Sequence, residues 1–161
     1  EGTTDGARLA AQMAALGMAV PDDTSWSYLF SRILTDKVEP QLGQGRMTIL
    51  DRYPAAEAAL ARRASDDKRV SERFELYACG VELANGFGEL TDANEQRRRF
   101  EAEMAEKQRL YDETYPIDED FLAALALMPA ASGVALGFDR LVMLATAAPK
   151  IEAVLWAPVA E

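Results

Sequence analysis

Two glutamates, Glu75 and Glu82, lie on either side of Cys79-Gly80 in a segment rich in strand-forming residues. Gly80 can adopt the positive φ that a two-residue hairpin turn requires. With Cys79 and Gly80 as the turn, Tyr77 faces Glu82 and Glu75 faces Ala84. The two glutamates then share one side of the ladder as diagonal neighbours, with Cβ atoms about 7 Å apart.

Two carboxylates at this spacing repel each other unless a positive charge lies between them or one is protonated. Mg²⁺ would suit them, because it prefers oxygen ligands and usually keeps phosphate and water in its shell. The alternative is a solvated strand face on which Glu75 and Glu82 are separate surface carboxylates. The residues alone leave both interpretations open.

Asn85, Phe87 and Glu89 follow Glu82 and share one strand parity, whereas Glu82 has the other. All four side chains can face one pocket only if the chain bulges between them. Asn85 and its neighbouring glycines are poor strand formers, and a glycine inside a strand often marks a bulge or a close ligand. The expected place is Ala84-Asn85-Gly86.

The composition limits the classes of protein that these residues could serve. The chain has 161 residues, 49% hydrophobic and 27% charged, which is sufficient for one globular domain. It has one cysteine, no histidine and a net charge of −10, which excludes histidine-based metal sites and argues against broad binding of nucleic acid through phosphates. We expect a cytoplasmic protein without a signal peptide or membrane span.

The elements expected around the hairpin combine antiparallel strands with separate helices, which indicates an α+β fold. Asp92 and Asp118 are expected to cap helices, and Glu95 would complete a capping box with Asp92. The remaining expected elements are helices over 5–19, 24–40, 55–63 and 139–147, and strands over 47–50, 134–138 and 153–159.

Two stretches carry a resemblance to a known family. Phe74 to Asp92 reads F-E-L-Y-x-x-G-x-E-L-A-N-G-F-x-E-L-x-D, and Gly133 to Leu144 reads G-V-A-L-G-F-D-R-L-V-M-L. The first resembles the lysine-specific class II aminoacyl-tRNA synthetases and their relatives, and the second resembles motif 3 of that class. The resemblance implies a class II antiparallel sheet flanked by helices. It also implies that residues 1–161 are the C-terminal portion of a catalytic domain, with a mostly helical part at 1–64 and the core hairpin and motif 3 at 65–161.

The same resemblance implies roles for the candidate residues. Glu75 and Glu82 would hold Mg²⁺ on ATP, and Arg140 would contact the nucleotide near its γ-phosphate or against the adenine. An Asp139–Arg140 pair at a helix start is the alternative for Arg140. Glu89 is acidic where aspartate-type relatives carry an arginine, so a cationic amino acid, lysine or an isomer of it, is expected. Phe87 would line the aliphatic stem, and Asn85 would bond the polar end.

Ala135 bears on which lysine is used. Lysyl-tRNA synthetases resemble this segment but have a glycine at the position of Ala135. The elongation factor P–lysine ligase branch is similar to this chain at G-V-A-L-G-F-D-R, which contains Ala135, and at L-G-Q-G-R, which is Leu42 to Arg46. That branch transfers (R)-β-lysine to a lysine of elongation factor P. A lysyl-tRNA synthetase acting on tRNA-Lys and a non-catalytic paralogue remain the alternatives. A homodimer is expected for the full-length protein.

Motif 1 and the motif 2 arginine of class II synthetases are not found in the sequence. Arg73-Phe74-Glu75 superficially fits the R-x-E of motif 2, but it falls in the hairpin. This chain alone is therefore expected to bind ATP weakly or not at all, and to show no pyrophosphate exchange.

Overall fold

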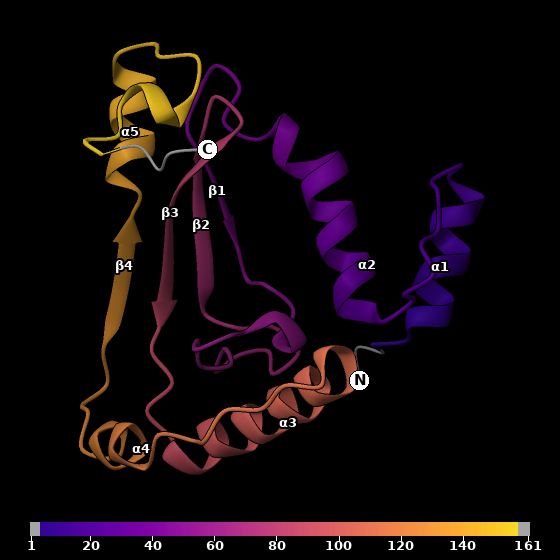
Figure 1. Ribbon diagram of the computed structural model, residues 1–161, viewed down its shortest axis with the longest axis vertical. Coiled ribbons are helices and arrows are strands. Elements are labelled where there is room, and N and C mark those ends of the chain that lie inside the picture. The colour runs from indigo at the N-terminus through magenta and orange to yellow at the C-terminus, as the bar shows by residue number, and fades with distance from the viewer. Residues whose placement is uncertain (1–3, 158–161) are drawn as a thin grey trace.

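The computed structural model of the chain describes residues 4–157. Its centre is a four-stranded antiparallel sheet in the order β1-β2-β3-β4. The strands are Thr48–Asp51, Arg73–Ala78, Val81–Gly88 and Ser132–Leu136. The sheet and its separate helices confirm the predicted α+β class (Figure 1).

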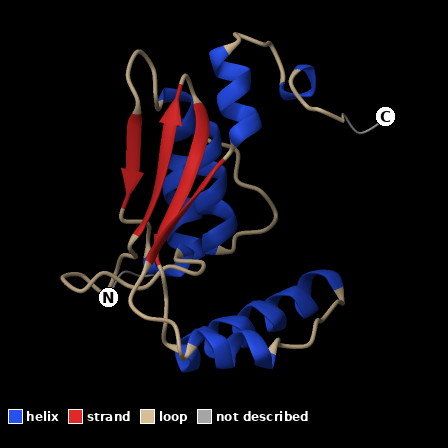
Figure 2. Cartoon of the chain, turned by 90° about the vertical axis from the view of Figure 1, so that its left-hand side faces the viewer, coloured by secondary structure: helices blue, strands red, loops and turns tan. Residues whose placement is uncertain are grey.

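Within residues 4–157, five α-helices lie on one side of the sheet and at its ends. They are α1 Gly6–Ala15, α2 Trp26–Ile33, α3 Ala93–Tyr111, α4 Glu119–Leu125 and α5 Phe138–Ala145. A π-helical turn at Leu34–Val38 and a 3₁₀ turn at Glu39–Gln41 continue α2. Helices α1 and α2 lie on one side of the sheet, α3 and α4 cross one end of it, and α5 extends beyond the other end (Figures 1 and 2). Among residues 4–157, no helix has the length and apolar character needed to cross a membrane.

Aspartate caps begin α3 and α4 as predicted. Asp92 accepts hydrogen bonds from the backbone N–H groups of Asn94 and Glu95, at 2.9 and 3.0 Å, and Asp118 caps α4 by accepting one from the N–H of Phe121 at 2.9 Å. The predicted capping box is only half formed, because the Glu95 carboxylate pairs with Arg99. An ion pair one turn along the helix therefore takes the side chain that the box would use.

The helix predicted over 55–63 is wrong. Only Ala55–Glu57 forms a 3₁₀ turn, and Ala59 has a positive φ of 49°. The Arg62 N–H then donates to the carbonyl oxygen of Gly88 at 2.7 Å, so this segment runs alongside the end of β3. Backbone hydrogen bonds to the sheet thus outweigh the helix propensity of an alanine-rich sequence, which is a weak preference.

The strand predicted over 153–159 is also not found where the chain is described. Residues 151–153 form a 3₁₀ turn, and residues 154–157 have no strand pairing; 158 and 159 lie outside the described residues. A strand needs a neighbour for its backbone hydrogen bonds. Helix α5 leads the chain away from β4, which leaves this segment without one (Figure 1).

The loop at 41–46 is fixed to the turn of the β2–β3 hairpin. Cys79 and Gly80 both have positive φ, 53° and 75°, as a two-residue hairpin turn requires. Their N–H groups donate to the carbonyl oxygens of Gly43 and Leu42, at 2.8 and 3.0 Å. The loop therefore helps to hold the strand ends that carry the site.

Gly43 is the residue that allows this contact. Its φ is 71°, and a Cβ at this position would lie 2.6 Å from the Cα of Ala78. We expect Gly43→Ala to destabilise the full-length protein by about 2–4 kcal/mol, from left-handed strain together with overpacking. Gly45→Ala is a matched control, because Gly45 also has a φ of 71° but has no atom within 4 Å of the added Cβ. Urea unfolding measures both; equal losses would contradict the close-contact explanation.

Candidate active site

The strand register brings the predicted site residues to one face of the sheet, called here the site face. Glu75 pairs with Asn85 on β3, and Asn85 pairs in turn with Ala135 on β4. Tyr77 pairs with Glu82. Because paired residues point to the same side, all five side chains lie on the site face.

A β-bulge in β3 produces this arrangement. A bulge was predicted from the sequence, but the structure has it at a different residue. Tyr77 pairs with Glu82 and Leu76 pairs with Ala84, so Leu83 is the extra residue on β3. The predicted bulge at Ala84-Asn85-Gly86 and the predicted pairing of Glu75 with Ala84 are therefore wrong. Leu83 is buried, with 3% of its surface exposed, and burial of this side chain favours the bulge one residue earlier.

Glu75 is an enclosed carboxylate with four donors around it. Its Oε2 accepts hydrogen bonds from the hydroxyl groups of Tyr53 and Tyr77, at 2.5 and 2.6 Å. Its Oε1 accepts from Arg73 at 2.8 Å and, at the longer distance of 3.5 Å, from Asn85. Only 5% of Glu75 is exposed. Such a set of donors, one of them charged, offsets the cost of burying a carboxylate.

The two phenols beside Glu75 stay protonated at physiological pH. Burial first, and then the hydrogen bond and the charge of Glu75, raise the pKa of Tyr53 and of Tyr77. A protonated phenol donates its hydrogen to a neighbouring carboxylate. Glu75 is thus held as an acceptor of two fixed hydroxyl hydrogens.

Glu82 is the more accessible acid of the pair. One third of its side chain is exposed, and its Oε2 lies 3.2 Å from the guanidinium of Arg140. The same nitrogen of Arg140 donates to the backbone oxygen of Glu82 at 2.9 Å. Arg140 on α5 is therefore paired with Glu82 on β3, and not with Asp139.

Glu89 and Phe87 continue the site face beyond Asn85. The carboxylate of Glu89 lies over Gly133, because a Cβ added to Gly133 would lie 2.7 Å from Glu89 Oε1. Asn85 has a buried Oδ1 without a hydrogen-bond partner among residues 4–157. A buried acceptor without a donor is costly, so this atom suits a ligand that supplies one. Phe87, Asn85 and Glu89 thus offer an apolar surface, an acceptor and a negative charge.

Gly133→Ala should displace the Glu89 carboxylate, because the added methyl group would occupy the space that this carboxylate fills. In the full-length protein, we expect the KM for a cationic amino acid to rise by about tenfold, while the KM for ATP changes less than twofold. Ser132→Ala is the control, since Ser132 is exposed on the opposite face of β4. Steady-state kinetics with each substrate varied in turn measure this, and equal changes in both KM values would contradict it.

The sequence prediction missed Glu39 and Arg73. Glu39 lies in the 3₁₀ turn Glu39–Gln41, which contacts β3, and burial first, and then the charges of Glu75 and Glu82, raise the pKa of its carboxyl group. Arg73 donates to Glu75 and lies against Phe87. Its strand parity, equal to that of Glu75, is a signal that could have identified it. No comparable signal exists for Glu39, because only tertiary contacts bring the 3₁₀ turn near β3.

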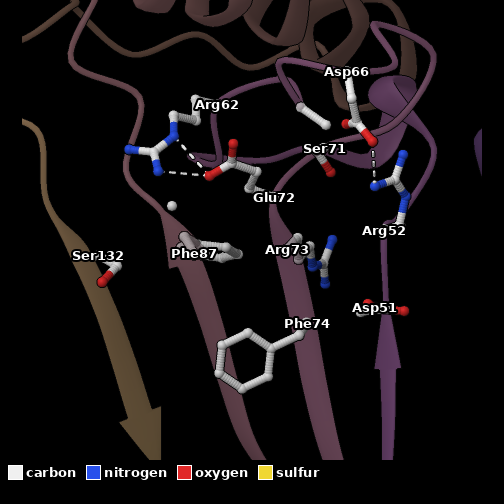
Figure 3. A pocket seen from close by; sticks show the side chains of 12 residues that line it. Asp51, Arg52, Arg62, Asp66, Ser71, Glu72, Arg73, Phe74, Phe87 and Ser132 are labelled. Atoms are coloured by element: carbon white, nitrogen blue, oxygen red, sulfur yellow. Dashed lines mark hydrogen bonds and ion pairs between the residues drawn. The ribbon is translucent and has the colours of Figure 1, made fainter.

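A cavity lies mainly on the other side of the sheet, although Arg73 and Phe87 are among the residues that line it (Figure 3). Most of its charged side chains are paired within the protein. Arg62 forms an ion pair with Glu72 at 2.6 Å, and Arg52 forms one with Asp66 at 3.0 Å. With these charges neutralised, the cavity offers no clear preference for a charged ligand.

The donor set on the site face fits Mg²⁺ bound mainly through a nucleotide. Within residues 4–157, no three acidic, cysteine or histidine side chains are grouped so that they could hold a metal ion by themselves. Glu82 and Glu75 nevertheless offer carboxylate oxygens on one face, and Mg²⁺ needs only one or two when phosphates and water complete its shell. Glu82 is the more available of the two, because Glu75 already accepts from four donors.

The chain is similar to known proteins over most of its length. The family model described as class II tRNA synthetases (D, K and N) matches residues 32–161. The "Elongation factor P--(R)-beta-lysine ligase" of Haemophilus influenzae (strain PittGG) is 52% identical over 134 residues, which cover 83% of this chain and 40% of the relative. The proteins of the same name from Mannheimia succiniciproducens and Pectobacterium atrosepticum are 51% and 45% identical, covering 83% and 92% of the chain. The matched part is 40–46% of the length of these relatives.

Proposed function

Because the chain belongs to the family of class II tRNA synthetases (D, K and N), we propose that the full-length protein is an ATP-dependent ligase that activates a lysine. The amino acid is (R)-β-lysine or lysine, and the acceptor is a lysine side chain of elongation factor P. The observation that carries this proposal is the single face on which Glu89, Asn85 and Ala135 lie with the acids Glu75 and Glu82. A cytoplasmic location and a homodimer are parts of the same proposal.

The cationic amino acid fits the end of the site face that carries Glu89. An ammonium group would form a charge-assisted hydrogen bond with the Glu89 carboxylate, and exclusion of water would strengthen it. The buried Oδ1 of Asn85 can accept a further hydrogen from the amino acid. Phe87 supplies apolar surface for the aliphatic stem. A lysine satisfies all three groups, whereas an acidic amino acid would be repelled by Glu89.

The nucleotide fits the other end, where Glu82, Glu75 and Arg140 lie. Mg²⁺, when bound on the ATP phosphates, would neutralise part of their charge, and Glu82 and Glu75 would hold it. Arg140 can change partners from Glu82 to a phosphate oxygen or stack on the adenine, since a planar guanidinium does both. In the reaction the amino-acid carboxylate attacks the α-phosphorus and pyrophosphate leaves, which gives an aminoacyl adenylate. The amine of the acceptor lysine then attacks the acyl carbon and AMP leaves.

The acceptor is tested directly with purified full-length protein, ATP and labelled (R)-β-lysine. We expect label on elongation factor P and not on tRNA-Lys. Label on tRNA-Lys alone would replace the ligase with a lysyl-tRNA synthetase. If neither acceptor carries label, and isothermal titration detects no ATP binding, the protein is a non-catalytic paralogue.

Ala135 provides a second arm of the same experiment. It pairs with Asn85 and faces the amino-acid end of the site. Ala135→Gly should shift the preference of the full-length protein from (R)-β-lysine towards lysine, because it removes one methyl group from the pocket. A single methyl group discriminates by about 10–200-fold at most. An unchanged ratio of kcat/KM for the two amino acids would show that Ala135 does not set this choice.

A further inference from the structure

Arg73 is a largely enclosed guanidinium at the beginning of β2, and the proposed function gives it no role in binding either substrate. Its side chain is 18% exposed. Enclosing a guanidinium is costly unless its donors are used. One terminal nitrogen donates to Glu75 Oε1 at 2.8 Å, and the other donates to the backbone oxygen of Glu57 at 2.7 Å. The side chain is thus fixed by directional bonds from both terminal nitrogens, while its buried Nε has no hydrogen-bond partner among residues 4–157.

Two aromatic rings complete the surroundings of Arg73. The central carbon of its guanidinium lies 4.4 Å from the centre of the Tyr53 ring and 5.9 Å from the centre of the Phe87 ring. Arg73 and Phe87 are direct partners in the β2–β3 register, and Figure 3 shows their side chains next to each other on neighbouring strands. A planar cation over an aromatic face is attracted by the ring and restricts its orientation.

The contacts of Arg73 therefore reach both ends of the site face. Glu75 belongs to the nucleotide end, and Phe87 belongs to the amino-acid end. Tyr53 closes the arrangement, because its hydroxyl group donates to Glu75 while its ring lies against Arg73. Movement of Arg73 would therefore free both the Glu75 carboxylate and the Phe87 ring from their present positions.

We propose that Arg73 is a positioning residue that fixes Glu75 for the metal-bound nucleotide and Phe87 for the amino acid, so that one guanidinium couples the two halves of the site. This inference rests on the proposed function. Lysine cannot replace Arg73 fully, because an ammonium group lacks the planar fork that bonds Glu75 and Glu57 together and stacks on a ring.

The test uses Arg73→Lys and Arg73→Gln in the full-length protein, with ATP and the amino acid varied separately in pyrophosphate exchange. We expect Arg73→Lys to raise both KM values by about three- to tenfold, and Arg73→Gln to lower kcat/KM for both substrates by about ten- to hundredfold, as small displacements of positioned groups do. Arg69→Lys is the control, because the side chain of Arg69 is exposed and, among residues 4–157, is paired with Asp67 of its own loop. It should leave both KM values unchanged. If urea unfolding shows that Arg73→Gln does not fold, Arg73→Lys decides the test.

Double-mutant cycles show whether Arg73 acts through the two partners. The effect of Arg73→Lys on the KM for ATP should largely disappear in a Glu75→Gln background. Its effect on the KM for the amino acid should largely disappear in a Phe87→Leu background. Additive effects in both cycles, or a change in stability with both KM values unchanged, would overturn the inference alone. A wild-type protein without pyrophosphate exchange would overturn the proposed function, and the inference with it.

Discussion

Replacing Glu89 with glutamine in the full-length protein should lower kcat/KM for lysine or (R)-β-lysine by about 30- to 1000-fold, with little change in the KM for ATP. Removal of one partner from an enclosed charge pair costs about 2–4 kcal/mol, and each 1.4 kcal/mol is a factor of ten. Glutamine has nearly the same shape as glutamate, so the carboxylate position over Gly133 is kept and only the charge is lost. Steady-state pyrophosphate exchange, with the amino acid varied, measures the effect.

A control separates this effect from a general loss of negative charge. Glu101→Gln removes one charge from the exposed surface of α3 and should leave kcat/KM within twofold of wild type. If Glu89→Gln retained wild-type kcat/KM for lysine, or if it lowered the affinity for ATP to the same extent, Glu89 would not be the group that recognises the cationic side chain.

The second large effect concerns Glu82. Glu82→Gln should raise the KM for Mg·ATP by about ten- to hundredfold, because a neutral amide is a poor substitute for a carboxylate near a divalent cation. Higher Mg²⁺ concentration should restore part of the activity, since Glu82 is the acid with accessible surface. Kinetics over a series of Mg²⁺ concentrations measure this.

Glu75→Gln is the matched comparison for Glu82→Gln. Glu75 accepts from two phenols and from Arg73, so replacing its carboxylate also disturbs enclosed hydrogen bonds. We expect Glu75→Gln to lose activity that added Mg²⁺ does not restore, and to unfold at lower urea concentration than wild type. Equal rescue of both variants by Mg²⁺ would contradict the assignment of Glu82 as the more available ligand.

The hairpin could be predicted from sequence because its signals are local. Gly80 at the turn, together with strand-forming residues around it, determined the pair β2 and β3 correctly. The face shared by Glu75, Tyr77 and Glu82 followed from strand alternation. The position of the bulge did not follow, because it depends on burial of Leu83 beneath the sheet, which is a tertiary property.

Apart from Arg73, which lies two residues before Glu75 on the same strand, the parts of the site that sequence reasoning missed come from segments distant along the chain. Tyr53 precedes Glu75 by 22 residues, and its hydroxyl group reaches the carboxylate only because β1 and β2 are adjacent. Similarly, the 55–63 segment was predicted as a helix from its alanines, whereas bonds to the end of β3 hold it in an irregular path. Local propensity cannot report such contacts.

The most direct test of the site as a whole is amino-acid-dependent pyrophosphate exchange by the full-length protein, with lysine, (R)-β-lysine and norleucine compared. Norleucine keeps an aliphatic stem but lacks the terminal ammonium group that Glu89 would bind. We predict exchange with at least one of the two lysines and none above background with norleucine. Exchange with norleucine at a rate similar to lysine, or no exchange with any of the three, would contradict a face that binds Mg·ATP and a cationic amino acid together.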